Sequence, residues 1–241
     1  MAKQQKSKHS ILRTVGQINP EFTDVKIDRQ FRVKDIRDLT ETTYVLRFDK
    51  NDIQFTAGQH LTLGLPGDNQ VREYSIYSTE NDPYLEVLIK EVEDGLVSRK
   101  LHRVKVGDSI SVDGPFGFFT IDEEKRKNGK FLFVATGTGL APFHSLAGSY
   151  PDLDYKILHG VRFAEEAYES DLYPEGRYTL CTSRDDRGNF TGRVTDYLTI
   201  NKVDSDTLVY LCGNCDMIYE VYDLLTSHGL DSDQIKTEVY F

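Results

Sequence analysis

The stretch FLFVATGTGLAP, residues 131–142, divides the sequence into two parts with different patterns. Its first five residues form an apolar run that predicts a buried strand, its two glycines predict a turn, and Pro142 stands where a helix begins. Downstream, strand-like and helix-like segments alternate, which predicts a parallel sheet covered by helices on both faces. The predicted strands are 131–135, 155–159, 178–183 and 207–212, and the predicted helices are 142–148, 165–172, 193–199 and 217–228.

Upstream of this stretch, from about residue 26 to residue 121, the segments are shorter and richer in β-branched and aromatic residues. Turn signals such as Pro66-Gly67, Gly107-Asp108 and Gly114-Pro115 separate them. Short strands with regular turns predict an antiparallel barrel, with one helix expected near residues 96–101. The predicted strands are 33–36, 43–48, 60–65, 71–77, 84–92 and 109–112.

The sequence therefore predicts a β + α/β protein, in which an N-terminal antiparallel β-barrel is followed by a parallel-sheet α/β domain. We assign residues 26–124 to the barrel domain, 130–241 to the α/β domain, and 1–25 to a polar N-terminal extension. The hydrophilic run at 125–130 is expected to form a hinge between the two domains.

The composition argues against several function classes. A formal net charge of −10 does not suit general nucleic-acid binding, which needs a basic face. No segment approaches the roughly 18 unbroken apolar residues of a membrane helix, and the N-terminus lacks the apolar stretch of a secretory signal. The three cysteines suit a reducing compartment, so a cytoplasmic location is expected. They form no cluster for an iron–sulfur centre, and no metal site is expected.

Arg72-Glu73-Tyr74-Ser75 lies in one of the predicted barrel strands. Because alternate residues of a strand share a face, Arg72 and Tyr74 point one way, whereas Glu73 and Ser75 point the other. A cofactor at the end of this strand could use the guanidinium for a phosphate, the ring for stacking, and the hydroxyl for a hydrogen bond to a heteroaromatic nitrogen. Taken alone, these residues are more commonly an ordinary barrel strand of mixed polarity.

The turn Thr136-Gly137-Thr138-Gly139 lets the backbone approach a phosphate closely. It is neither a P-loop nor the full Rossmann spacing, since Pro142 replaces the third glycine. Three arginines, Arg162, Arg184 and Arg193, follow strand-like segments of the α/β domain. Ligands of open parallel sheets bind at the carboxyl ends of the strands, where arginines suit the 2′-phosphate of NADP. Each arginine taken alone is more commonly a solvated charge.

Two segments near the C-terminus stand out. Cys212-Gly213-Asn214-Cys215 has thioredoxin-like spacing, but it follows the last strand of the α/β pattern rather than the first strands of a domain. Buried thiols are the structural alternative. The chain ends in Thr237-Glu238-Val239-Tyr240-Phe241, whose alternation and terminal aromatic pair predict a docked final strand rather than a frayed end.

These segments, in their order along the chain, resemble the ferredoxin–NADP reductase family of the bacterial ferredoxin/flavodoxin–NADP reductase type, from about Lys26 to Phe241. The resemblance implies that the barrel binds FAD and that the α/β domain binds NADP(H). The residues implied for FAD are Arg72, Glu73, Tyr74, Ser75, Leu88, Ile89, Lys90, Gly95, Leu96, Val97, Ser98, Tyr240 and Phe241. Those implied for NADP are Thr136, Gly137, Thr138, Gly139, Arg162, Ser183, Arg184, Arg193, Cys212, Gly213 and Asn214.

The resemblance also implies individual roles. Arg72 is implied to contact the FAD pyrophosphate, Tyr74 to stack on the isoalloxazine, and Tyr240 to cover its opposite face. Phe241 is implied to meet the adenine. The implied catalytic residues are Ser75, which would lie near the flavin N5, Cys212, which would lie beside the hydride path, and Glu238, which would relay a proton.

The implied activity is hydride transfer between NADPH and FAD and exchange of single electrons with a separate acidic carrier protein, ferredoxin or flavodoxin. Because this chain is itself acidic, docking would need a local basic face, for which Arg99, Lys100 and Arg103 are candidates; a solvated helix face is the alternative. Two other functions stay open: an NAD(P)H:flavin reductase, and a non-catalytic redox sensor. The sensor would use Cys212 and Cys215, where a regulatory disulfide is conceivable because Cys215 is not a usual family feature.

Overall fold

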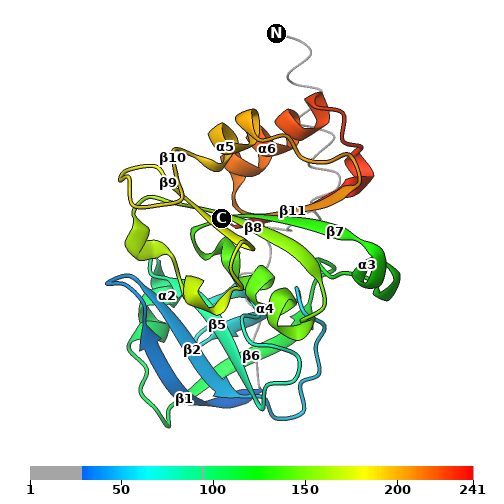
Figure 1. The fold of residues 1–241 in the computed structure, drawn as a ribbon. Coiled ribbons are helices and arrows are strands. Elements are labelled where there is room, and N and C mark those ends of the chain that lie inside the picture. Colours follow the sequence, from blue (N-terminus) through cyan, green and yellow to red (C-terminus); the bar gives the residue numbers. More distant parts are fainter. Residues whose placement is uncertain (1–28, 94, 241) are drawn as a thin grey trace, which may run out of the picture.

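The computed structural model describes residues 29–93 and 95–240, which form an antiparallel sheet and a parallel sheet (Figure 1). The antiparallel sheet uses residues before the FLFVATGTGLAP stretch, and the parallel sheet begins with that stretch. The predicted fold class is confirmed. The predicted extension at 1–25 and Phe241 lie outside the described residues, and the domain boundaries at 26, 124 and 130 stay predictions.

The antiparallel sheet has six strands in the order β4-β3-β6-β1-β2-β5. Alternate residues such as Phe31 and Val33 of β1 are buried while their neighbours are exposed, so one face of the strand forms the core. An isolated antiparallel bridge between Ile76 and Val87 joins the two ends of this order and closes the sheet into a barrel. The strands are β1 (Gln30–Asp38), β2 (Thr43–Asp49), β3 (His60–Gly64), β4 (Val71–Ser75), β5 (Tyr84–Lys90) and β6 (Ser109–Phe116), and helix α2 (Leu96–His102) follows β5.

The parallel sheet also has six strands, in the order β10-β9-β8-β7-β11-β12. Helix α4 packs on the face turned towards the barrel, where Phe143 stacks on Phe133 with 4.7 Å between ring centroids. Helices α5 and α6 pack on the other face (Figure 1). The strands are β7 (Lys130–Thr136), β8 (Asp154–Val161), β9 (Tyr178–Thr182), β10 (Phe190–Thr191), β11 (Thr207–Asn214) and β12 (Ile235–Tyr240), and the helices are α4 (Ala141–Ser149), α5 (Val194–Ile200) and α6 (Cys215–Ser227).

Three segments differ from the sequence prediction. The run predicted as a hinge begins within α3 (Glu123–Asn128), a short helix whose first turn is capped by the Asp122 carboxylate. The helix predicted at 165–172 is wrong: two 3₁₀ turns, η3 (Ala164–Glu166) and η4 (Ser170–Leu172), stand there, separated by Glu169 at a left-handed φ of 47°. The short strand β10 was not predicted.

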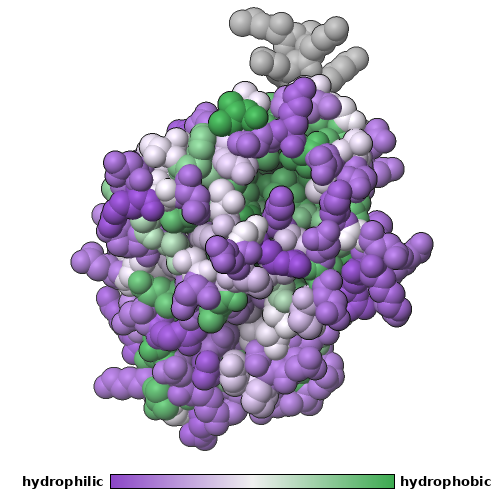
Figure 2. All heavy atoms as spheres, in the orientation of Figure 1, coloured by the Kyte–Doolittle hydropathy of each residue, from purple (hydrophilic) through white to green (hydrophobic). Residues whose placement is uncertain are grey.

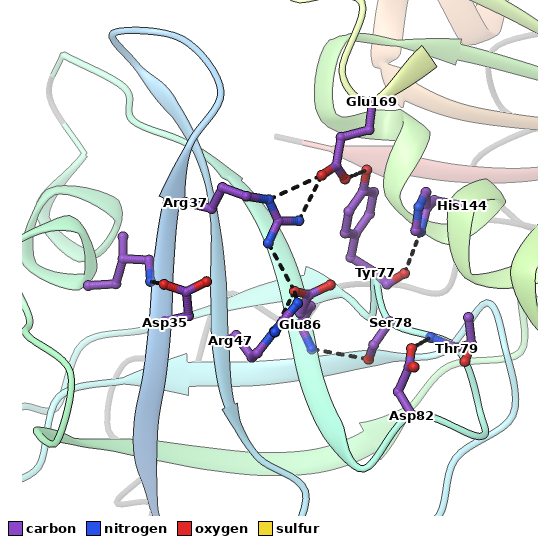
Figure 3. Close-up of polar contacts among 11 residues, drawn as sticks. Asp35, Arg37, Arg47, Tyr77, Ser78, Thr79, Asp82, Glu86, His144 and Glu169 are labelled. Atoms are coloured by element: carbon purple, nitrogen blue, oxygen red, sulfur yellow. Dashed lines mark hydrogen bonds and ion pairs between the residues drawn. The ribbon is translucent and has the colours of Figure 1, made fainter. Parts of the chain in front are cut away.

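The Glu169 carboxylate makes contacts across the domain junction (Figure 3). One oxygen of its carboxylate accepts hydrogen bonds from the Arg37 guanidinium at 2.8 and 3.1 Å, and the other accepts from the Tyr77 hydroxyl at 2.6 Å. Arg37 also pairs with Glu86, which is 5% exposed and is held by Arg47 at 2.8 Å. A continued α-helix through 165–172 would not bring Glu169 to these partners in the same way.

Two further contacts tie helix α4 to the barrel. His144 bonds through Nδ1 to the carbonyl oxygen of Tyr77 at 2.8 Å, and its ring stacks on the Tyr77 ring (Figure 3). Ser145 donates to the carbonyl oxygen of Ser78 at 2.7 Å. These buried polar contacts fix the barrel against the parallel sheet only a few residues beyond Ser75.

The face of the molecule seen in Figure 1 is largely hydrophilic, with apolar residues gathered over the region of β11 (Figure 2). Within residues 29–93 and 95–240, no helix is long and apolar enough to cross a membrane. Within the same residues, no group of three or more His, Cys, Asp or Glu side chains is arranged to hold a metal ion.

Candidate active site at the junction of the two sheets

Four polar side chains converge where the end of β4 meets β11 and β12. The Tyr240 hydroxyl donates to Ser75 Oγ at 2.6 Å, and Ser75 in turn donates to Glu238 Oε2 at 2.9 Å. Cys212 Sγ lies 3.9 Å from the same carboxylate oxygen, because the parallel register places Cys212 beside Glu238. The structure therefore brings together the three predicted catalytic residues and the predicted C-terminal tyrosine.

Burial sets the charge of this cluster. The Glu238 side chain is 19% exposed, and loss of hydration raises the pKa of its carboxyl to about 7. The nearby Glu73 carboxylate acts in the same direction, whereas the hydrogen bonds with Ser75 and Cys212 oppose it. Burial also raises the pKa of the Cys212 thiol, so Cys212 stays a neutral thiol and is not a poised nucleophile.

The raised pKa of Glu238 makes stability depend on pH. The ordinary value is 4.5 and the folded value about 7, so protonated Glu238 stabilises the fold fully below pH 4.5, and this contribution is lost as the pH rises through 7. We expect the unfolding free energy of the FAD-loaded wild type, relative to Glu238→Gln, to fall by about 2 kcal/mol between about pH 5 and pH 8. Urea unfolding at several pH values measures this. If the plots of unfolding free energy against pH are parallel for the wild type and Glu238→Gln, the prediction is wrong. The exposed-site variant Glu41→Gln should show the pH dependence of the wild type.

His60 joins this cluster, although the sequence reasoning missed it. It lies on β3 directly opposite Ser75 in the antiparallel register. Its Nδ1 is 3.9 Å from Glu238 Oε1, and its Nε2 is 3.9 Å from Glu73 Oε1. A Cβ at Gly117 would lie 2.8 Å from His60 Nδ1, so only glycine lets the backbone pack this closely over the ring. The sequence shows His60 as a single histidine at the start of a predicted strand. Its partners Glu73 and Glu238 lie on other strands, so no local pattern points to them.

The predicted FAD residues of β4 differ in accessibility: Arg72 and Glu73 are exposed, Tyr74 is half-buried and Ser75 is buried. Arg72 is exposed, and its Nη1 donates to the carbonyl oxygen of Val71 at 2.8 Å. Tyr74 is half-buried against the barrel core, on the face opposite to Glu73 and Ser75 as expected from strand alternation.

The other predicted FAD residues on the barrel differ in accessibility. Leu88 and Ile89 are buried in the core, and Lys90 pairs with Glu166 at 2.9 Å across the domain junction. Ser98 is buried at the start of α2, and its hydroxyl oxygen accepts from the Val92 amide at 3.4 Å, which leaves its proton available for a second bond. Gly95, Leu96 and Val97 complete this turn, with Leu96 exposed.

The glycine turn lies directly against the Cys212 segment. A Cβ at Gly139 would be 2.4 Å from the Cys212 carbonyl oxygen, which explains why glycine is required there. Gly137 has a left-handed φ of 52°, and a Cβ at this position would meet nothing within 4 Å, so the backbone faces open space. A second missed histidine, His159, is fully buried beneath the turn and bonds through Nε2 to the Gly137 carbonyl oxygen at 2.9 Å.

The predicted NADP arginines gather at the carboxyl ends of neighbouring strands. The Arg184 amide donates to the Arg162 carbonyl oxygen at 2.9 Å, and both side chains are exposed, as is that of Ser183. Arg193 is the N-cap residue of α5 and follows β10, which pairs with β9. The four residues therefore share one edge of the sheet.

The Cys212–Cys215 segment has a structural explanation. Both thiols are free, with Cys212 buried and Cys215 half-buried at the first residue of α6. The Asn214 side-chain oxygen caps this helix by accepting from the backbone amides of Asp216 and Met217. The Asn214 backbone amide donates to Thr136 Oγ1 at 2.9 Å. Gly213, at φ 126°, lets the chain turn beside Thr136, so this segment and the glycine turn form one surface.

The residues present fit a dinucleotide on each side of the junction. The barrel offers an accessible guanidinium, a half-buried ring and a hydroxyl at its end, and the sheet offers a glycine turn facing open space and a group of arginines at its edge. Guanidinium groups and backbone amides are the donors that phosphates prefer.

A barrel and a parallel sheet that share one cluster of hydroxyl, thiol and carboxyl groups define a flavin-dependent oxidoreductase, and residues 30–121 match the oxidoreductase FAD-binding domain family. The chain belongs to the flavodoxin/ferredoxin–NADP reductase family. It is 30% identical over 233 residues to the flavodoxin/ferredoxin–NADP reductase of Rhodobacter capsulatus, an alignment covering 82% of this chain and 85% of that protein.

Two further proteins resemble this chain, one in sequence and one in fold. The toluate 1,2-dioxygenase electron transfer component of Pseudomonas putida is 32% identical over 219 residues; the alignment covers 83% of this chain, which spans 64% of that relative's length. The crystal structure of a ferredoxin NADP⁺ reductase from Neisseria gonorrhoeae shares the fold, with a TM-score of 0.81 over 90% of this chain and 100% of that one at 24% identity.

Proposed function

We propose that this protein transfers hydride between NADPH and FAD and exchanges single electrons with a ferredoxin or a flavodoxin. The observation that carries this proposal is the contact of Ser75, from the FAD-binding barrel, with Tyr240 at 2.6 Å and Glu238 at 2.9 Å, from the parallel sheet. The two domains meet at one polar cluster, where the reactive ends of two cofactors could face each other.

On the barrel side, Arg72 would hold the FAD pyrophosphate, Tyr74 would stack on the isoalloxazine, and Ser75 would hydrogen-bond its reactive edge. Tyr240 would cover the other face of the ring. Glu73, the backbone of 88–90 and the turn at Gly95–Ser98 would complete the site. The contact proposed between Phe241 and the adenine concerns a residue outside the described part of the chain.

On the sheet side, the turn Thr136–Gly139 would hold the NADP pyrophosphate, because its backbone faces open space at Gly137. Arg162, Ser183, Arg184 and Arg193 would hold the 2′-phosphate, which favours NADPH over NADH. The segment Cys212–Asn214 would border the nicotinamide, since it packs directly against the glycine turn.

Catalysis of hydride transfer is mostly positioning. When bound, FAD supplies the chemistry that accepts two electrons as hydride and releases them singly. Tyr240 gives up its 2.6 Å bond to Ser75 and moves aside so that a nicotinamide ring can enter. Ser75 keeps Glu238 as its acceptor, and Glu238, protonated below about pH 7, holds or passes a proton. Cys212 lines the site as a neutral thiol.

A second candidate function is electron supply to an oxygenase, as the name of the Pseudomonas putida relative describes. The 32% identity to that protein favours it. The chemistry at the junction would be the same, and the two candidates differ only in the acceptor. The flavin reductase alternative differs in how flavin is used, because the reduced flavin would leave the protein as a product. Stoichiometric FAD in the purified protein would argue against this alternative.

The proposed docking surface around α2 is partly neutralised by neighbouring carboxylates. Arg99 Nε lies 3.4 Å from Glu91 Oε1, and Lys100 pairs with Asp68. Arg103, the C-cap residue of α2, is exposed. Of the three predicted cations, Arg103 is therefore the one best placed to meet an acidic carrier.

Arg103→Glu is expected to slow reduction of an acidic flavodoxin by about fivefold at low ionic strength, because repulsion slows encounter. NADPH–ferricyanide turnover should stay unchanged, since the small acceptor does not need this surface. Stopped-flow experiments over a salt series measure the rates with both acceptors. Added salt should reduce the difference in flavodoxin reduction between the variant and the wild type. Lys202→Glu, which reverses an exposed cation of the α/β domain, serves as the matched control. An equal loss of rate with flavodoxin and ferricyanide, or no loss with either acceptor, would show that this surface does not dock the carrier.

The proposed function is tested by adding a carrier to the NADPH-reduced protein without oxygen. Oxidised flavodoxin or ferredoxin should reoxidise the bound FAD and become reduced at the same rate. If NADPH reduces the protein but neither carrier accepts electrons, the carrier assignment is wrong and an oxygenase partner becomes the favoured candidate.

A further inference from the structure

The proposed reaction releases a proton. NADPH and two acceptors that take only electrons, such as oxidised ferredoxin or ferricyanide, yield NADP⁺, two reduced acceptors and one H⁺, because the hydride supplies two electrons and one proton. In the reverse direction one proton is taken up. Ser75 is 3% exposed and the Glu238 side chain 19% exposed, so neighbouring titratable groups are the candidates to carry this proton between the cluster and water.

Glu238 uses its two oxygens differently. Oε2 accepts from Ser75 at 2.9 Å, whereas Oε1 faces His60 Nδ1 at 3.9 Å. The opposite nitrogen of the same ring, Nε2, faces Glu73 Oε1 at 3.9 Å. The Glu73 side chain is 61% exposed, so these groups form a line from the buried carboxyl to water.

We infer that His60 and Glu73 are the route by which a proton passes between Glu238 and solvent, an inference that rests on the proposed function. In the outward direction the O–H bond of Glu238 breaks as an N–H bond forms at His60 Nδ1. The N–H bond at Nε2 then breaks as an O–H bond forms on Glu73, which releases the proton to water. The two 3.9 Å separations are ion-pair distances, and side-chain rotation that shortens each by about 1 Å brings it within hydrogen-bond reach.

The surroundings suit this direction of transfer. Burial lowers the pKa of His60, and Glu73 opposes that effect, so the ring is neutral at rest and can accept at Nδ1. Glu238 faces Ser75 from β4, Cys212 from β11 and His60 from β3. The ring of His60 also faces Phe116 of β6, with 6.1 Å between centroids, and it packs beside Gly117, where a Cβ would lie 2.8 Å from Nδ1.

Two variants separate proton movement from hydride transfer. His60→Gln should lower NADPH–ferricyanide turnover by about 10-fold and enlarge its solvent deuterium isotope effect, and Glu73→Gln should act in the same direction by about threefold. In His60→Gln, bleaching of bound FAD by NADPH in an anaerobic stopped-flow experiment should stay within about twofold of the wild type, because hydride transfer carries its own proton. His228→Gln and Glu41→Gln, at exposed sites, are the matched controls.

A third measurement does not depend on turnover. In ring-nitrogen NMR spectra of the oxidised, FAD-loaded protein, the signal lost in His60→Gln identifies His60. Its titration midpoint should fall in Glu73→Gln and stay unchanged in Glu41→Gln, because the Glu73 carboxylate faces the ring and favours its protonated form. Added imidazole should restore part of the turnover of His60→Ala, which a merely structural role of His60 would not allow.

The outcomes distinguish this inference from the proposed function. If NADPH does not bleach the wild type, the proposed function fails and the route fails with it. If the wild type is reduced and passes on electrons, but His60→Gln and Glu73→Gln match their controls in turnover and isotope effect, the route alone is overturned.

Discussion

Ser75→Ala should lower NADPH–ferricyanide turnover by about 100-fold while the protein keeps its FAD. Ser75 Oγ accepts from Tyr240 and donates to Glu238, so it joins the barrel to both of these residues of the parallel sheet. Alanine would leave a buried carboxyl and a phenol without their shared partner and would remove the hydroxyl proposed to contact the flavin. Steady-state kinetics together with the FAD content of the purified variant measure the effect.

Ser205→Ala, at an exposed serine of the α/β domain, is the control and should behave as the wild type. Loss of FAD from Ser75→Ala would indicate a binding role rather than a catalytic one. Turnover within about twofold of the wild type, with FAD retained, would remove Ser75 from the reaction.

The double variant Arg162→Ala/Arg184→Ala should raise the KM for NADPH by about 100-fold and leave the KM for NADH within about twofold. The two residues are joined through their backbones at 2.9 Å and both side chains are exposed at the carboxyl edge of the sheet. A hydrogen bond to a charged group contributes about 1.5–3 kcal/mol, and each 1.4 kcal/mol is tenfold in affinity. NADH lacks the 2′-phosphate and so loses little.

Initial-rate kinetics with both nucleotides give the comparison, and Arg32→Ala on the barrel serves as the control. Equal increases in KM for NADPH and NADH would show that the arginines support the fold of this edge rather than the 2′-phosphate. An unchanged KM for NADPH would place the phosphate elsewhere.

Local patterns were sufficient to predict most of the fold. The apolar run at 131–135, the glycines and Pro142 are adjacent in the sequence, and their physical requirements act over a few residues, so β7, the turn and α4 follow directly. The final strand could be predicted for the same reason, since alternation and the terminal aromatics are local features.

The segment at 165–172 shows where local reasoning fails. Its composition favours a helix, but Glu169 contacts Arg37 and Tyr77, which lie 132 and 92 residues away in the sequence. Tertiary contacts therefore override the local preference. His60 was missed for a related reason, since Glu73 reaches it only through the pairing of β3 with β4, and Glu238 only after the barrel and the parallel sheet have come together.

The most direct test of the central claim is anaerobic addition of NADPH to the purified protein. The readout is the absorbance at about 450 nm, where oxidised flavin absorbs. We predict that the protein carries one FAD, that one equivalent of NADPH bleaches it, and that NADH at the same concentration does so much more slowly. A protein that purifies without FAD and binds none when it is added, or a bound FAD that NADPH fails to bleach, would contradict the account.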